Sequence, residues 1–177
     1  KGGGSGVARS DGWLNGVGCD CDLIPDDRIH VTSSAGFDAQ MTPIPITGHF
    51  DMASDRVTGV MQNGVFPAKG WVHLNSDGRD EWRGMEIDIA ADGAYTADFS
   101  GSFDLIPGDR GEVWYFDPAG NRLGANLYSL HIEVAYDDDF VYAQTEPGAT
   151  ITITVVGKAT LTGQADADGR VEGWSEE

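Results

Sequence analysis

The sequence predicts an all-β protein built from antiparallel strands. Apolar and polar residues alternate along many short segments, as they do when successive side chains of a strand point to opposite faces. The 25 glycines and 7 prolines follow no collagen-like period and mark frequent turns. No segment of ten or more residues shows a convincing 3.6-residue period, so we expect no long amphipathic helix.

The alternation is clearest in Thr150–Val155, where apolar and β-branched polar residues follow each other without a break. In Met85–Ile89 the three apolar residues share one face, and the segment around Tyr95 has the same pattern. Between these segments, Ala91-Asp92-Gly93 predicts a tight hairpin, because glycine adopts the positive φ that such a turn requires. Further strands are expected at Arg28–Thr32, Val57–Gln62, Gly70–Leu74, Glu112–Phe116 and Asn126–Val134.

A repeated phrase organises the chain. The sequence Asp-Leu-Ile-Pro follows both Cys21 and Phe103, an offset of 82 residues. Self-similarity at such a distance is typical of tandem structural units. Pro25 and Pro107 restrict the backbone and lack an N–H donor, so we expect the phrase to be a corner that ends one strand and leads to the next.

The repeat divides the chain into one whole unit and two partial ones. Residues 51–135 are predicted to be a complete central repeat, residues 7–50 the C-terminal half of one repeat, and residues 136–177 the N-terminal half of another. Each half alone would have bare sheet edges and a half-covered core. We therefore expect the halves to complete a second sandwich, within or between molecules. Residues 1–6 are rich in glycine and are expected to be a flexible linker or an expression remnant.

The net charge of −18, from 29 acidic and 11 basic residues, disfavours binding to nucleic acids and to anionic membranes. No apolar run approaches the roughly 18 residues of a membrane span, so no membrane insertion is expected. Cys19 and Cys21 are one residue apart, and a disulfide between them would be strained. We expect two buried, small apolar side chains.

Four segments together resemble tandem bacterial immunoglobulin-like repeats of secreted and surface proteins and are similar to carboxypeptidase-regulatory-like β-sandwich domains. They are Val57–Gly59, Pro67–Val72, Ala91–Tyr95 and Phe103–Asp109. The resemblance covers most of the chain beyond residue 7. It implies immunoglobulin-like antiparallel β-sandwich repeats of about 80 residues. It also implies a non-enzymatic structural or adhesive module, extracellular or on the cell surface, whose partners are other protein subunits or copies of itself. The family has no fixed catalytic residues to transfer.

Tryptophans suggest an alternative function. Trp82 lies in the charged segment around Asp80 and Arg83, which we expect to be a loop, and an exposed indole there would offer a flat surface for a sugar or a protein. These three residues are the candidate ligand-binding site of a carbohydrate-binding module. The structural alternative is that Trp82 folds back onto the sandwich edge. Trp71, beside Val72, is expected in the core.

A remote alternative is a glycoside hydrolase that uses Glu86 and Asp88. Two carboxylates about 5 Å apart on one face of a strand suit a nucleophile and an acid/base. The motif that they resemble has a third carboxylate, and this chain has Ala91 at that position. Because Met85, Ile87 and Ile89 would face the core, both carboxylates are expected in solvent.

Calcium is the candidate cofactor. Asp137, Asp139, Asp166 and Asp168 resemble parts of calcium loops, which collect several oxygen ligands. Neither the segment with Asp137 and Asp139 nor the segment with Asp166 and Asp168 has a full set of calcium ligands. Asp168-Gly169 also fits a hairpin turn. No His-x-His or His-x-x-x-His spacing indicates a transition-metal site.

Overall fold

The structure is a computed structural model that describes residues 5–7, 24, 27–76, 78–135, 140–145, 147–157, 159–166 and 169–174. Every regular element in these residues is a β-strand, and every strand pairing is antiparallel, which confirms the predicted all-β antiparallel fold. Cys19 and Cys21 lie outside the described residues.

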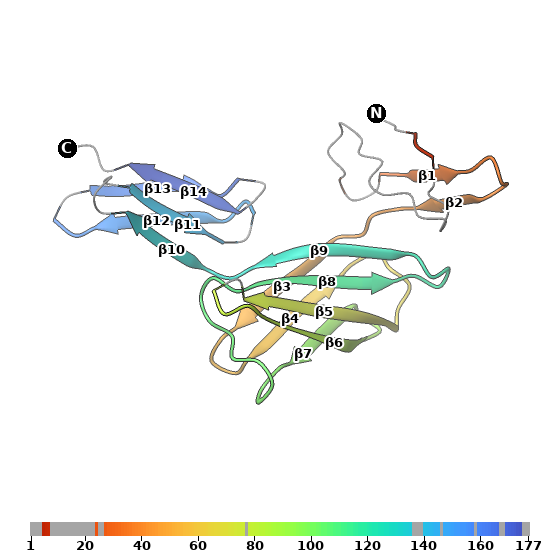
Figure 1. Ribbon diagram of the computed structural model, residues 1–177, viewed down its shortest axis with the longest axis horizontal. Helices are drawn as coiled ribbons and strands as arrows, with labels where there is room; N and C mark the ends of the chain where they lie inside the picture. Colours follow the sequence, from red (N-terminus) through yellow and green to blue (C-terminus); the bar gives the residue numbers. More distant parts are fainter. Residues whose placement is uncertain are drawn as a thin grey trace. The chain divides into compact units, whose positions relative to one another are not determined.

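Figure 1 labels the strands in chain order. They are β1 (Ile29–Thr32), β2 (Asp38–Met41), β3 (Ile46–Asp51), β4 (Arg56–Met61), β5 (Ala68–Ser76), β6 (Glu81–Ile89), β7 (Ala94–Asp98), β8 (Arg110–Phe116), β9 (Arg122–Tyr128), β10 (His131–Ala135), β11 (Phe140–Gln144), β12 (Thr150–Val155), β13 (Ala159–Gln164) and β14 (Arg170–Trp174).

The chain forms two compact units, residues 1–43 and residues 44–177. In the first unit β1 and β2 form a hairpin. His30 Nε2 lies 2.9 Å from Asp38 Oδ1 across this pair.

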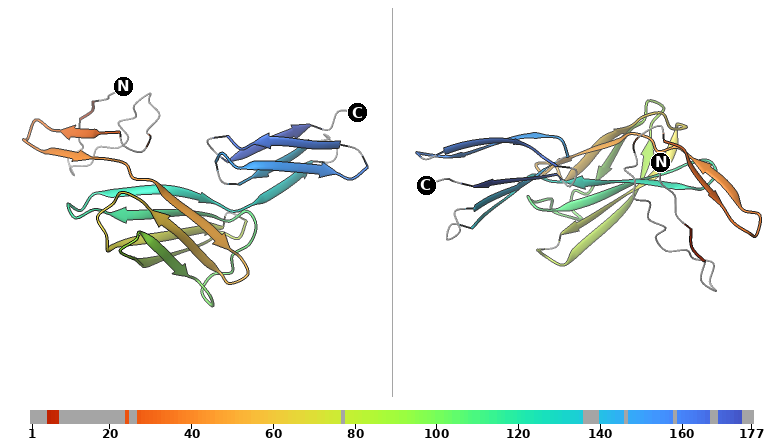
Figure 2. Two further views of the ribbon diagram at one scale, coloured as in Figure 1. Left: turned by 180° about the vertical axis from the view of Figure 1, so that it is seen from behind. Right: turned by 90° about the horizontal axis from the view of Figure 1, so that it is seen from above.

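In the second unit, seven strands form one sheet in the order β3-β4-β7-β6-β5-β8-β9. β6 and β7 share a single residue pair, Ile89 with Tyr95. The sheet therefore divides there into a three-stranded layer, β3-β4-β7, and a four-stranded layer, β6-β5-β8-β9. Figure 1 shows the four-stranded layer with its strands side by side, and the left view of Figure 2 shows β3 and β4 from behind.

The core contains side chains from all seven strands. Each large apolar side chain buried there stabilises the fold by roughly 1.5–3 kcal/mol. Strand alternation fixes which side chains take part: in β5, Val72 and Leu74 are fully buried, so Trp71 and His73 point to the outer face. The core residues are Phe50, Val57, Met61, Val72, Leu74, Ile87, Ile89, Tyr95, Ala97, Phe99, Phe103, Leu105, Val113, Tyr115 and Leu127.

The predicted hairpin at residues 91–93 joins β6 to β7. Gly93 has φ = 83°, and its N–H donates to the carbonyl of Ala90 at 2.9 Å. A Cβ atom on Gly93 would collide with the carbonyl oxygen of Met61. Only glycine adopts this positive φ without strain and also leaves room for the Met61 carbonyl.

The repeated phrase makes the same turn in both copies. The N–H of Ile106 donates to Asp109 Oδ2 at 2.9 Å, and the N–H of Ile24 donates to Asp27 Oδ2 at 3.1 Å. The N–H of Asp109 donates to the carbonyl of Ile106, and the N–H of Asp27 donates to the carbonyl of Ile24, each at 3.2 Å. The turns precede β8 and β1, as expected for a corner that leads to the next strand.

Pairing patterns recur along the chain. β10-β11-β14 has the order of β3-β4-β7, β12 pairs with β13 as β5 pairs with β6, and β1 pairs with β2 as β8 pairs with β9. The strand pairing and the sequence repeat divide the chain at different places. β3 pairs within the central sheet, whereas the sequence repeat assigns residues 46–50 to the preceding unit. β10 pairs with the C-terminal strands, whereas the sequence repeat assigns residues 131–135 to the central unit. The division into repeats stays a prediction.

The strand expected over Asn126–Val134 is two strands. β9 ends at Tyr128 and β10 begins at His131. Between them, Ser129 is buried and its Oγ accepts a hydrogen bond from the N–H of Gly108 at 2.8 Å. A polar side chain that bonds to a loop interrupts the pairing, although the alternation on either side is continuous.

Candidate functional site

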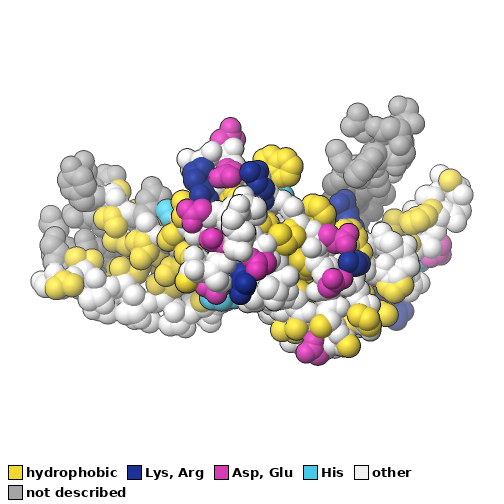
Figure 3. Space-filling view, turned by 90° about the horizontal axis from the view of Figure 1, so that it is seen from below, with side chains coloured by type: hydrophobic (Ala, Val, Ile, Leu, Met, Phe, Trp, Pro, Cys, Tyr) yellow, Lys and Arg dark blue, Asp and Glu magenta, His cyan; other side chains and the backbone are white. Residues whose placement is uncertain are grey.

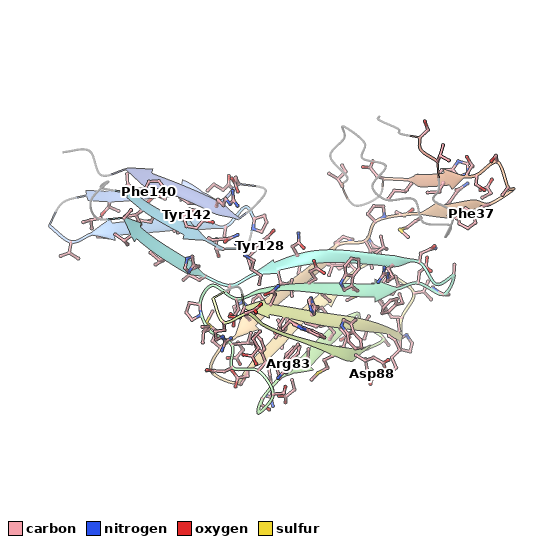
Figure 4. The ribbon with its side chains drawn as sticks, in the orientation of Figure 1. Phe37, Arg83, Asp88, Tyr128, Phe140 and Tyr142 are labelled. Atoms are coloured by element: carbon pink, nitrogen blue, oxygen red, sulfur yellow. The ribbon has the colours of Figure 1, made fainter. Side chains whose placement is uncertain are left out.

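Aromatic and polar side chains gather on the outer face of the four-stranded layer, which we call the outer aromatic face. The strand register arranges this face in rows that run across β6, β5, β8 and β9. Figure 4 labels Asp88 and Tyr128, at opposite corners of the face. The rows are Glu86-Trp71-Trp114-Gly124, Gly84-His73-Glu112-Asn126 and Trp82-Asn75-Arg110-Tyr128.

Trp71 lies over Gly84. A Cβ atom on Gly84 would stand 2.7 Å from Nε1 and 2.8 Å from Cζ2 of the indole, so only glycine leaves room for the ring there. The side chain is 40% exposed. The expectation that Trp71 belongs to the core is therefore wrong, because Val72 and Leu74 take the inward phase of β5 and Trp71 must take the outward phase.

Trp114 has a matching arrangement in the neighbouring strand. A Cβ atom on Gly124 would stand 2.6 Å from Cε3 of its indole. The guanidinium carbon of Arg122 lies 5.3 Å from the ring centre, within cation–π distance. The indole Nε1–H donates to Glu112 Oε2 at 3.2 Å. These contacts fix the orientation of the ring.

Three hollows open on the outer aromatic face, and His73 lines all of them. One, of about 360 Å³, lies between Trp71 and Trp114. A second, of about 350 Å³, is lined by polar side chains that include Arg110 and Asn126. The third, of about 400 Å³, is lined by Trp82 and its neighbours. These volumes lie at the lower end of the range for small-ligand sites.

The predicted ligand-binding residues separate into two groups. Trp82 lies within β6 and not in a loop; it is 64% exposed, with its ring centre 5.7 Å from that of His73. Asp80, at φ = 49°, lines the same hollow. Arg83 instead donates to the carbonyl of Ser102 at 3.1 Å and to that of Trp82 at 2.9 Å. Trp82 and Asp80 thus share a surface, while Arg83 is bonded to backbone groups.

Glu86 and Asp88 both bind Lys69. The ammonium nitrogen lies 2.8 Å from Glu86 Oε1 and 2.8 Å from Asp88 Oδ1. Hydrogen bonds to Asp88 and Glu86 raise the pKa of Lys69. All three side chains are exposed to solvent, as expected for both carboxylates.

Of the residues predicted to bind calcium, Asp137, Asp139 and Asp168 lie outside the described residues. Asp166 Oδ1 accepts a hydrogen bond from the N–H of Arg170 at 2.8 Å, and the N–H of Gly169 donates to the carbonyl of Asp166 at 3.0 Å. The carboxylate therefore supports a hairpin turn. The part of the chain that is described contains no cluster of three metal-binding side chains. Calcium binding stays a prediction.

Within the described ranges, no helix is long and apolar enough to span a membrane. Basic and acidic side chains lie next to one another, with hydrophobic side chains among them, on the face shown in Figure 3.

No protein-family model matches the chain, and no curated protein matches it. Solved structures similar to it include a tetra-tandem repeat from the extending region of a large adhesion protein, at 16% identity and a TM-score of 0.37, over 84% of this chain and 47% of that one. Another is from a study of host cell surface retention of a 1.5-MDa bacterial ice-binding adhesin, at 17% identity and a TM-score of 0.33, over 75% of this chain and 54% of that one. The chain thus spans about half the length of the structures that it matches.

Sequence reasoning did not assign Trp71 and Trp114 to a site. A signal for Trp71 is present in β5, where Lys69, His73 and Asn75 have the same phase as the tryptophan. A tryptophan in phase with polar residues belongs to the outer face, even though it is apolar.

Proposed function

We propose that the chain is a non-enzymatic, extracellular structural or adhesive module built from immunoglobulin-like repeats. The observation that carries the proposal is the recurrence of one pairing pattern, β3-β4-β7 with β5-β6, in β10-β11-β14 with β12-β13. The immunoglobulin fold packs seven antiparallel strands in two layers, and β3–β9 are seven such strands in a three-stranded and a four-stranded layer.

Stretching the whole chain by its two ends in a force spectrometer tests the repeat organisation. If the central repeat is an independent unit, it unfolds in one step that releases about 80 residues, roughly 280 Å of extended chain. Release of the whole chain in one step, or a gradual extension without steps, would contradict the proposal.

The non-enzymatic role is tested by incubating the chain with soluble glucans and measuring new reducing ends. We expect none above the buffer control. Hydrolysis that is lost in Glu86→Gln, and kept in the matched variant Asp104→Asn at an exposed position outside this sheet, would assign catalysis to Glu86 and Asp88 and overturn this part of the proposal.

The proposal includes assembly through the partial repeats. Ile132 pairs in register with Ala143, so both side chains face the same side of β10-β11-β14. Ala143 is fully buried, yet Ile132 and Val134 are 58% and 59% exposed. A core-facing apolar row that is open to water favours a covering partner.

A suitable partner is the β1–β2 hairpin of another copy. β1 and β2 pair with each other as β8 and β9 do. In the central sheet Leu127 of β9 packs against Gly48 of β3, because a Cβ atom on Gly48 would stand 2.6 Å from Leu127 Cδ2. The β1–β2 hairpin of a second copy would cover β10 in the same way. The contact joins different surfaces of two copies, so it produces head-to-tail assemblies, either closed rings or open chains.

Light scattering across a concentration series tests this assembly. We expect the mass of the wild-type chain to rise with concentration and Ile132→Asp to remain monomeric. Val65→Asp, at an equally exposed apolar position outside this sheet, is the matched control and should behave as wild type. A folded wild-type chain that stays monomeric at high concentration would contradict assembly.

A further inference from the structure

We propose that the outer aromatic face binds a carbohydrate chain without charged groups, and that Trp71 and Trp114 are its central stacking surfaces. This goes beyond the proposed function, because a repeat that only spaces or assembles needs no such face. The site also extends beyond Trp82 and Asp80 to residues of all four strands of the layer.

The two indoles line the same hollow of this face, one from each side. Trp71 and Trp114 are directly opposite each other on β5 and β8. Their rings extend in opposite directions, over Gly84 on β6 and over Gly124 on β9. The C–H faces of sugar rings are apolar and pack on flat aromatic surfaces of this kind. Because Gly84 and Gly124 make room for the rings, we count them as positioning residues.

Polar groups next to the indoles suit hydroxyl groups. The neighbouring row contains His73, Glu112 and Asn126, and the row after it contains Asn75 and Arg110. Together these side chains offer both donors and acceptors, and a sugar hydroxyl is itself both a donor and an acceptor. A ligand with many hydroxyls therefore satisfies this surface better than an apolar peptide does.

The charges of the face favour an uncharged ligand. Lys69 is bound by Glu86 and Asp88, and Arg122 lies over the ring of Trp114. Glu112 accepts from Trp114 Nε1. Lys69 and Arg122 thus have partners on the face itself, the hollow at Trp82 is lined by the acidic residues Asp80 and Glu81, and the net charge of −18 repels anionic polymers.

The face is long enough for several sugars. Trp82 is opposite Asn75, four residues along β5 from Trp71, which corresponds to about 13 Å. The hollows between these positions all include His73, so they are neighbouring parts of one surface. We infer that an oligosaccharide lies across the face, with Trp82 as a peripheral contact.

The test uses the whole chain on an array of neutral and sialylated glycans, followed by titration of each neutral glycan that binds, with tryptophan fluorescence and calorimetry as readouts. Trp71→Ala and Trp114→Ala are expected to weaken binding at least about tenfold, as central aromatic contacts do. Trp82→Ala is expected to have a smaller effect. Val60→Ala, an exposed apolar position on the other layer, should bind as wild type.

A second variant separates positioning from folding. Gly84→Val keeps both tryptophans and adds a residue that favours strands, but its side chain displaces the indole of Trp71. It should melt near the wild-type temperature and lose binding about as much as Trp71→Ala. The proposal is overturned if no neutral glycan binds at millimolar concentration. It is also overturned if sialylated glycans are preferred, or if Trp71→Ala and Trp114→Ala still bind with wild-type affinity. None of these outcomes bears on the repeat organisation.

Discussion

Arg79 and Asp109 form an ion pair of 3.1 Å between Nη2 and Oδ2, and the Asp109 side chain is only 1% exposed. Arg79 also donates to the carbonyl of Asp104 at 2.7 Å and lies 4.9 Å from the ring centre of Phe103. One cation thus connects the turn between β5 and β6 with the repeated corner before β8.

Asp109→Ala is expected to lower the free energy of unfolding by about 3 kcal/mol, the lower end of the range for breaking a buried ion pair. The loss is limited because the Arg79 side chain is 29% exposed and can reach water. Urea unfolding measures it. Asp104→Ala, an exposed position in the same corner, keeps the backbone carbonyl and should change the free energy by less than about 0.5 kcal/mol. Equal effects of the two variants would contradict this role of the pair.

Asp98 predicts a pH-dependent contribution to stability. Hydrogen bonds from Ser100 and from Arg56 lower the pKa of Asp98 to about 2, from its ordinary value of 3.8. The native state therefore favours the ionised form, and the stabilisation is complete above pH 3.8 and is lost as the pH falls toward 2. Asp98→Asn should melt below wild type at pH 7, and the difference should shrink near pH 2. A difference that is constant with pH would contradict this.

Gly93→Ala is expected to lower the free energy of unfolding by more than Gly101→Ala does. Both glycines have positive φ, at 83° and 76°, so alanine is strained at either position by about 1 kcal/mol. At Gly93 the new Cβ also collides with the carbonyl of Met61, whereas nothing lies within 4 Å at Gly101. Thermal melting of the two variants separates the collision from the strain. Similar melting temperatures would show that the backbone moves to relieve the contact.

Tyr95→Phe is expected to cost about 1 kcal/mol. The hydroxyl of Tyr95 donates to the carbonyl of Thr47 at 2.8 Å, and the residue is only 3% exposed, so phenylalanine leaves that carbonyl without this donor. Burial also raises the pKa of Tyr95, so it should ionise at a higher pH than a tyrosine in water. Chemical unfolding and ultraviolet titration check the two effects. Tyr128→Phe is the matched control for stability.

The sequence by itself determined the type of most elements. Thr150–Val155 coincides with β12, and the hairpin at Asp92-Gly93 lies where it was expected. The repeated phrase indicated the shared turn at Asp27 and Asp109. These features depend on neighbours within a few residues, because alternation, positive φ and side-chain bonds to the backbone are local.

Only the tertiary structure decided which surface the strands expose and which side chains meet on it. Trp71 is apolar, yet it lies on the outer face because Val72 and Leu74 face the other layer. Trp82 lies in a strand because β6 pairs with β5 as far as Ser76. Trp114 and Trp71 are opposite each other through a register that joins residues more than forty positions apart. Such pairings depend on burial against a segment that is distant in the sequence. The alternation of apolar and polar residues within one strand does not show which of its faces that segment covers.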